Sequence, residues 1–197
     1  MSENFMFNTQ NIIDTLKIRG FSLLNIPMLF IANPSVIKLN DKECEVSIPL
    51  NYLTKNHVGS MYFGVLAMGA DLGCGLMATE AIRKSGKNVV LIFKDFKATF
   101  LKRAESDVHF VCKQGKRVNT LVKKAIATGE RQNQTFEVLA LTPKKTGKEI
   151  IAKFALTLSL KLKSKDKKML PSFVGSISDV PDVAKKHDQY LGKSKKG

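Results

Sequence analysis

The chain has 197 residues, of which 44% are apolar and 25% charged, which suits one globular domain with a real core. These proportions exclude a fibre and a fully disordered chain, and we find no uninterrupted apolar run that would span a bilayer. The first ten residues lack the basic and apolar regions of a secretory signal. Cys44, Cys74 and Cys112 are odd in number and far apart, so the sequence indicates neither a disulfide framework nor a metal site. We therefore expect a protein of the reducing cytoplasm.

The net charge of +15 is the strongest anomaly in the composition. Such a charge attracts polyanions, which include nucleic acid, an anionic membrane surface and a phosphate-bearing ligand such as coenzyme A. Lysine is also a common solvating residue, and many of these lysines lie in the last part of the chain. Both interpretations of the charge remain open at this point.

The N-terminal third is expected to contain two short elements and a hairpin. Residues 8–18 carry apolar side chains at helical spacing, which predicts an amphipathic helix. Residues 23–31 are apolar but interrupted by Pro27, so they form either a second short helix or an extended piece. Residues 36–50 alternate in part around a turn at Asn40 and Asp41, which predicts a strand or a hairpin.

The rest of the chain predicts one long helix followed by several strands. The long helix is expected over residues 60–84, and an inserted amphipathic helix over 116–127. Four extended segments are expected at 89–101, 107–113, 135–141 and 148–160, the last pairing with its predecessor. This order is typical of an α+β domain in which a sheet packs on a central helix.

We expect one domain over residues 1–162, with an N-terminal helical extension, and a lysine-rich C-terminal tail over 163–197. Within the tail, residues 169–174 are a candidate docking segment.

The long predicted helix differs from an ordinary surface helix. Small and apolar residues occupy almost every position from 61 to 78, so the helix is expected to be buried nearly all round. It also carries Gly64, Gly69, Gly73 and Gly75, each of which costs about 1 kcal/mol relative to alanine in a helix interior. Such glycines predict a close approach by another part of the chain. A membrane-spanning helix is disfavoured by the glycines and by the charge of Asp71.

Asp71 is the only charged residue between Lys55 and Glu80. Burying a carboxylate in apolar surroundings is unfavourable unless it is paired or hydrogen-bonded. Asp71 is therefore either a reactive or ligand-facing group, or a structural aspartate bonded to backbone amides.

The residues before Asp71 carry a resemblance to a known family. The run Asn56-His57-Val58-Gly59-Ser60-Met61-Tyr62-Phe63-Gly64 resembles the Asn-x-x-Gly-x-x-His-Gly-Gly motif of hotdog-fold acyl-CoA thioesterases, in the branch similar to phenylacetyl-CoA thioesterase. In that branch an aspartate follows the histidine by nine positions, and here Asp71 follows Tyr62 by nine. The run looks closer still to a sibling hotdog family of uncharacterised function. Four positions fall in register: Asn56, Gly59, Gly64 and Asp71.

The resemblance implies a hotdog fold, in which a curved antiparallel sheet wraps a long central helix. In the family, amides at the helix N-terminus face the thioester carbonyl, and the aspartate acts as nucleophile or as general base for water. The matching amides here are those of Phe63 and Gly64. Gly64 and Asp71 lie seven residues apart, about 10 Å along a helix axis, so one chain can hardly place both at one carbonyl. The resemblance accordingly implies a homodimer, or a dimer of dimers, with sites at the interface.

The sequence departs from the family pattern where Tyr62 replaces the histidine and Phe63 replaces the first glycine. The backbone amides survive both changes, but a bulky Phe63 is expected to fill space that the acyl group would use. Tyr62 can donate a hydrogen bond but does not titrate near neutral pH as histidine does. The predicted catalytic residues are Asp71, Gly64, Phe63 and Tyr62, and the predicted substrate-binding residues are Asn56, His57, Gly59 and Ser60.

Two other residues have simpler interpretations. His109 alternates with Val108 and Phe110 and is expected to be exposed, while Cys74 is expected to be a core residue. We expect no cofactor and no metal.

Three functions compete on the sequence. The leading hypothesis is hydrolysis of an acyl-CoA thioester. The alternative is a non-catalytic hotdog module that binds acyl-CoA or a fatty acyl ligand, which the replaced His-Gly pair favours. Binding to nucleic acid or an anionic membrane surface is a third option that no motif supports.

Overall fold

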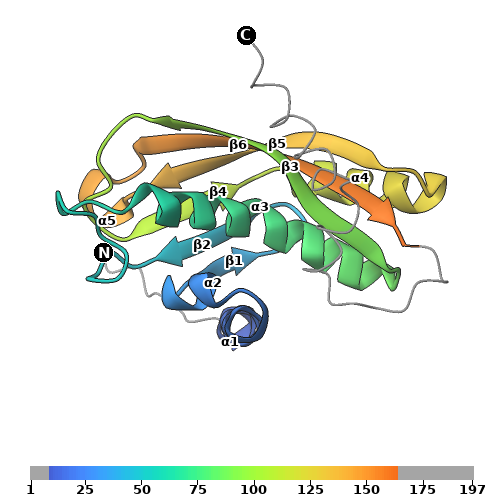
Figure 1. Ribbon diagram of the computed structural model, residues 1–197, viewed down its shortest axis with the longest axis horizontal. Helices are drawn as coiled ribbons and strands as arrows, with labels where there is room; N and C mark the ends of the chain where they lie inside the picture. Colours follow the sequence, from blue (N-terminus) through green and yellow to red (C-terminus); the bar gives the residue numbers. More distant parts are fainter. Residues whose placement is uncertain (1–8, 164–197) are drawn as a thin grey trace, which may run out of the picture. The chain divides into compact units, whose positions relative to one another are not determined.

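The computed structural model describes residues 9–163, in which a helix of 23 residues lies against a six-stranded sheet (Figure 1). Neighbouring strands all pair antiparallel, in the order β1-β2-β4-β5-β6-β3. This arrangement confirms the predicted α+β architecture of a long central helix on an antiparallel sheet. The helices are α1 (Thr9–Asn25), α2 (Pro27–Ile31), α3 (Phe63–Ser85), α4 (Gly115–Thr128) and α5 (Pro143–Thr146). The strands are β1 (Ser35–Leu39), β2 (Cys44–Ile48), β3 (Val89–Phe100), β4 (Val108–Cys112), β5 (Gln132–Leu141) and β6 (Ile150–Leu162).

The predicted elements of the N-terminal third are present with shifted boundaries. The first helix continues beyond residue 18 and through Gly20, so it includes part of the apolar segment expected to form the second element. Pro27 then starts α2, which makes the short-helix interpretation right and the extended one wrong. Proline suits this position because the first turn of a helix needs no amide donor. Strands β1 and β2 form the predicted hairpin.

The second half also follows the prediction. Helix α4 connects β4 to β5 as the expected inserted helix, and β5 pairs with β6 along most of its length. The lysine-rich segment from residue 164 onward, including the candidate docking segment 169–174, lies outside the described residues. The proposed division at residue 162 therefore remains a prediction.

Helix α3 is less enclosed than its sequence predicts. One side packs on the sheet and is fully buried, but Ala67, Met68, Asp71 and Gly75 lie on a half-buried stripe. The expectation of burial nearly all round was wrong because β3 is an edge strand, so no further strand of the described part of the chain covers this side. By length and composition α3 could cross a membrane, and 56% of its most apolar window is buried inside the fold.

Two glycines of α3 allow the helix to lie close to the sheet. A Cβ atom at Gly69 would lie 2.1 Å from the ring of Phe110 on β4, which is far inside contact distance. At Gly73 it would lie 3.0 Å from Val138 on β5. The predicted close approach is thus confirmed, and side chains of the central strands are the groups that approach.

The buried core lies between α3 and the central strands. Phe110, Phe136 and Phe154 are almost wholly enclosed. Cys74 is also fully buried, which confirms it as a core residue. It shares this core with the free thiols of Cys44 and Cys112, which are cross-strand neighbours on β2 and β4.

A substitution at Gly69 tests the close approach. Gly69→Ala removes a helix-breaking residue, which alone would stabilise the chain by about 1 kcal/mol. The clash with Phe110 should reverse this gain and lower the free energy of unfolding by about 1–3 kcal/mol, as seen by urea denaturation. The matched control is Gly20→Ala in α1, where a Cβ meets nothing within 4 Å and should stabilise the chain. Equal stabilisation by both substitutions would contradict the packing described here.

Candidate functional site

The loop before α3 is built by the side chain of Asn56. Its Oδ1 accepts hydrogen bonds from the amides of Val58 and Ser60, each at 3.1 Å, and its Nδ2 donates to Ser60 Oγ at 3.0 Å. Gly59 has a φ of 81°, in the left-handed region that favours glycine. These contacts show that Asn56, Gly59 and Ser60 shape the loop. His57, by contrast, is exposed and makes no side-chain hydrogen bond to another described residue.

Two backbone contacts attach this loop to the rest of the fold. The amide of Tyr62 donates to the carbonyl of Thr54 at 2.8 Å, and the amide of Met61 donates to the carbonyl of Ala104 at 2.8 Å. The buried hydroxyl of Thr54 donates in turn to the carbonyl of Pro49 at 2.7 Å. These bonds hold residues 60–62 outside the helix, and for this reason α3 begins at Phe63 and not at Ser60.

The N-terminus of α3 leaves two amides unused. Tyr62 is the N-cap residue, and its carbonyl accepts from the amides of Val65 and Leu66. Tyr62 makes no side-chain capping bond, and the amides of Phe63 and Gly64 donate to no other described residue. Free amides at a helix N-terminus carry a partial positive charge and suit an anionic or strongly polarised oxygen.

Aromatic rings flank these amides. A Cβ atom at Gly64 would lie 2.6 Å from Cε1 of Tyr62, so the tyrosine ring packs closely over this glycine. The rings of Tyr62 and Phe63 have centroids 4.8 Å apart. The Phe63 residue is 62% exposed, so its ring fills no internal space within residues 9–163. The expected obstruction of an acyl pocket by Phe63 is therefore not seen within one chain and remains a prediction.

Asp71 lies two turns further along α3, on its half-buried stripe. Its carboxylate makes no hydrogen bond or ion pair with any residue in the range 9–163. The alternative of a structural aspartate bonded to backbone amides therefore has no support in these contacts. Burial raises the pKa of the Asp71 carboxyl to about 6, because desolvation disfavours its charged form. Gly75 leaves room beside it, since a Cβ there would lie 3.2 Å from Asp71 Oδ1.

His109 differs from its prediction. Its side chain is only 17% exposed, and its Nδ1 lies 2.6 Å from Oε1 of Glu45, so the expectation of an exposed histidine was wrong. The residues pair because β2 and β4 are neighbouring strands and both side chains point away from α3. The sequence did not indicate this pair, because α3 and β3 separate β2 from β4 along the chain. Within residues 9–163 no group of three candidate ligands could hold a metal ion.

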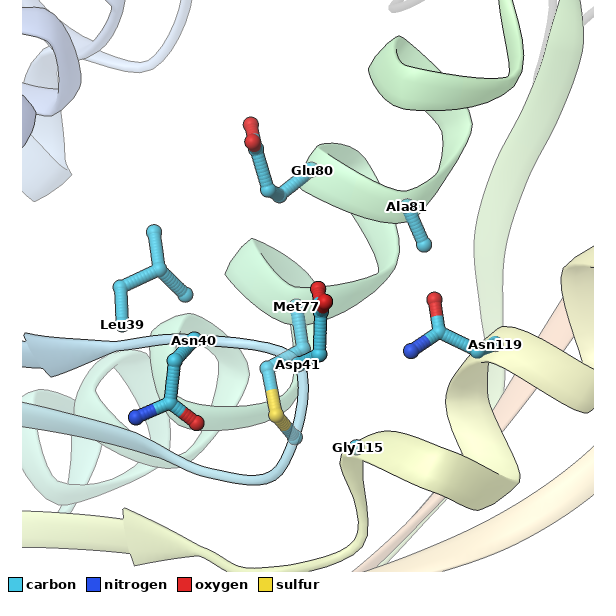
Figure 2. Close-up of a pocket in the computed structure, with 8 residues that line it drawn as sticks. All are labelled: Leu39, Asn40, Asp41, Met77, Glu80, Ala81, Gly115 and Asn119. Atoms are coloured by element: carbon cyan, nitrogen blue, oxygen red, sulfur yellow. The ribbon is translucent and has the colours of Figure 1, made fainter.

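The two main hollows of the surface lie away from the predicted site residues. Figure 2 shows the first one, between the C-terminal half of α3, the β1–β2 turn and the start of α4. Asp41 and Asn119 extend toward it, whereas the carboxylate of Glu80 points away from them, and the cavity volume of about 10 Å³ admits about one water molecule. The second, of about 320 Å³, lies between α1 and the end of α3 and is lined mainly by charged residues. Neither hollow is lined by Asp71 or by the residues of the helix N-terminus.

The fold is that of the hotdog class, as comparison with solved structures shows. A Shewanella oneidensis protein provisionally assigned as a thioesterase aligns with a TM-score of 0.63 and 16% identity, covering 76% of this chain and 97% of its own. A thioesterase of Haemophilus influenzae aligns with a TM-score of 0.53 and 15% identity, covering 74% and 91%. A thioesterase of Staphylococcus aureus gives 0.53 and 14%, covering 68% and 98%. At such low identity the likeness establishes the fold alone.

The family follows from the sequence itself. Residues 19–158 match the domain of unknown function DUF4442, and the chain belongs to that family. No curated protein matches the chain. The family match and the hotdog neighbours confirm the resemblance drawn from residues 56–71, including its sibling family of uncharacterised function.

The unpaired carboxylate predicts a pH-dependent effect of Asp71→Asn on stability. Because folding raises the pKa of this carboxyl from 3.8 to about 6, its own contribution to stability is greatest below the lower value and is lost as the pH rises through about 6. Asparagine stays neutral, so at neutral pH the variant should be more stable by about 1–3 kcal/mol, and the gain should vanish near about pH 4. Urea denaturation at the two pH values measures this difference.

The exposed Glu130, which forms no ion pair with a described residue, provides the control. Glu130→Gln should leave stability unchanged at both pH values. A loss of stability in Asp71→Asn at neutral pH would mean that the carboxylate has a stabilising partner.

Proposed function

We propose that the protein hydrolyses an acyl-CoA-type thioester in the cytoplasm, at a site formed between two copies of the chain. The observation that carries this proposal is the unpaired, half-buried Asp71 on the helix whose N-terminal amides also lack partners among the described residues. A carboxylate kept without a partner is unfavourable for folding, which is typical of a group retained for chemistry. The hotdog neighbours named as thioesterases support the reaction class.

The free amides and the carboxylate have complementary roles in this reaction. The amides of Phe63 and Gly64 would hold the carbonyl oxygen as it gains negative charge. Asp71 would take a proton from water as the water oxygen bonds to the carbonyl carbon. The tetrahedral intermediate then breaks its C–S bond, and the thiolate leaves with the proton returned by Asp71. A pKa of about 6 suits this role, because the group is ionised at neutral pH and still basic enough to accept a proton.

The same carboxylate could instead attack the carbonyl directly, giving a mixed anhydride that water then cleaves. The hydroxyl of Tyr62 would donate a hydrogen bond where the family has histidine. Asn56, Gly59 and Ser60 would act by holding the loop that presents the helix N-terminus, since their polar groups bond to one another. His57 would contact a ligand from the solvent-exposed side of the loop.

A second copy of the chain explains how distant groups act together. The helix N-terminus and Asp71 are about 10 Å apart along α3, too far for one carbonyl group. Strand β3 has 12 residues, and β6 is its only partner strand within residues 9–163, so no described strand pairs with its other edge. Phe96 and Phe100 are about half exposed on this strand, and both rings contact Phe154. Long open edges with apolar side chains favour pairing with another strand.

Pairing of two chains along β3 would cover the half-buried stripe of α3 and enclose Asp71 opposite the partner's helix N-terminus. This gives a homodimer, or a dimer of dimers. Exposed lysines on the same strand, Lys94 and Lys97, form no ion pair with a described residue and are available for the phosphates of coenzyme A.

The alternative is a non-catalytic module that binds acyl-CoA or a fatty acyl chain. The replacement of the family's histidine and glycine by Tyr62 and Phe63 favours it. The unpaired Asp71 opposes it, because a carboxylate contributes nothing favourable to an apolar acyl pocket.

Hydrolysis of a panel of short, medium, long and aromatic acyl-CoA esters tests the proposal. Wild type should release coenzyme A from at least one ester, with kcat/KM rising with pH through about 6 as Asp71 ionises. Asp71→Asn should lower kcat/KM by about 100-fold or more at matched folding and oligomer size.

Glu130→Gln again provides the control and should keep full activity. If neither wild type nor Asp71→Asn hydrolyses any ester while both bind one, the binding-module alternative replaces the enzyme.

A further inference from the structure

The side of α1 that faces the sheet carries mostly polar side chains, with Ile18 buried among them. Three of its side chains bond to the chain around β1, where they cover the edge of the sheet opposite β3. The bonds run from Asn11 Nδ2 to the carbonyl of Ile37 at 2.6 Å, from Arg19 Nε to the carbonyl of Pro34 at 2.9 Å, and from the amide of Val36 to Thr15 Oγ1 at 2.9 Å. Arg19 also donates to Ser35 Oγ at 3.0 Å. The orientation of α1 is therefore set by specific contacts.

The apolar side of α1 consequently faces outward and continues onto α2. Ile12, Leu16 and Leu23 recur at helical spacing on this side, so they form one stripe along α1. Nine large apolar residues of the two helices are exposed: Ile12, Ile13, Leu16, Phe21, Leu23, Leu24, Met28, Phe30 and Ile31. We refer to these nine residues as the α1–α2 apolar face.

This orientation is the reverse of an ordinary surface helix, which buries its apolar stripe and leaves its polar side in water. Turning α1 about its axis would bury the stripe but would break its side-chain bonds to β1. Large contiguous apolar faces on a protein surface mark interaction sites, and this one extends over two helices. The helix is thus held with its apolar stripe available to a partner.

The charges around the face indicate which partner it fits. Asp14 is the only acidic residue in α1 and α2, and its side chain is 14% exposed and bonded to Lys17. Lys17 is 65% exposed and pairs with this carboxylate, so no unpaired acidic group of α1 or α2 borders the face. The whole chain adds a net charge of +15. An apolar helix face in a cationic protein suits the surface of a bilayer that contains anionic lipids.

We propose that the α1–α2 apolar face docks the protein on an anionic lipid surface. Leu, Ile, Phe and Met side chains enter the boundary between headgroups and acyl chains, while the positive charge of the chain attracts the lipid phosphates and carboxylates. The face lies at the β1 edge of the sheet, opposite the β3 edge (Figure 1). Docking there leaves β3 free to pair with a second chain, so this inference does not depend on the proposed function.

Flotation of the full chain with lipid vesicles tests the proposal. Wild type should float with phosphatidylcholine vesicles that contain phosphatidylserine, less with phosphatidylcholine alone, and less at high salt. The double substitution Leu16→Gln with Leu24→Gln should lower the bound fraction about tenfold. The matched control is Tyr52→Gln with Leu53→Gln in the loop before α3. Leu16 and Leu53 are both 65% exposed, and Leu24 and Tyr52 both 83%.

The control should float as wild type does, with both variants folded by circular dichroism. The proposal is overturned if wild type floats with neither vesicle, or if the two double variants float to the same extent. It is also overturned if the Leu16 and Leu24 substitutions reduce the oligomer size in the absence of vesicles, because a second copy of the chain then covers this face.

Discussion

The close approach of α3 to the central strands is the contact on which the rest of the structure depends. Gly69 lies against the ring of Phe110, and no larger residue could occupy that position without moving the helix or the ring. This contact fixes both the depth and the rotation of α3 on the sheet. Its rotation then determines that Asp71 lies on the half-buried stripe beside β3, and its depth gives the carboxylate partial burial without a partner.

The two parts of the predicted site differ in how far their polar groups are hydrogen-bonded. The loop around Asn56 satisfies its own polar groups and is a well-bonded structural element. Asp71 and the amides of Phe63 and Gly64 leave theirs unsatisfied within the described part of the chain. Polar groups without hydrogen-bond partners are expected where a protein binds or converts a ligand. The α1–α2 apolar face likewise has no partner within the described residues. It lies at the opposite edge of the sheet and would bind a different kind of partner.

Much of the fold could be predicted because its signals are local. Alternation identified β6, helical spacing identified α4, and the glycines of the long helix indicated close packing. The partial exposure of α3 could not be predicted, because it depends on β3 being an edge strand. The order of strands in a sheet cannot be deduced from any single segment of the sequence. The reversed orientation of α1 was missed for a related reason. Its amphipathic pattern is visible in the sequence, but only the contacts of Asn11, Thr15 and Arg19 show which side faces inward.

The candidate site was predicted in part. The spacing from Asn56 to Asp71 indicated the loop, the helix N-terminus and a carboxylate, and the structure places these on one loop and one helix. Their assembly into one site requires a second chain, which no local signal specifies.

Activity from mixed dimers of two inactive variants tests this assembly most directly. Phe63→Pro deletes one of the free amides, and proline fits there because position 63 is the first of the helix and Tyr62 has an extended ψ of 138°. Phe63→Ala keeps the amide and serves as its control. Phe63→Pro and Asp71→Asn should each be inactive alone. Mixed dimers would contain one intact site, so an equal mixture should recover about a quarter of wild-type activity. Activity no greater than that of the two parents would contradict a site shared between two chains.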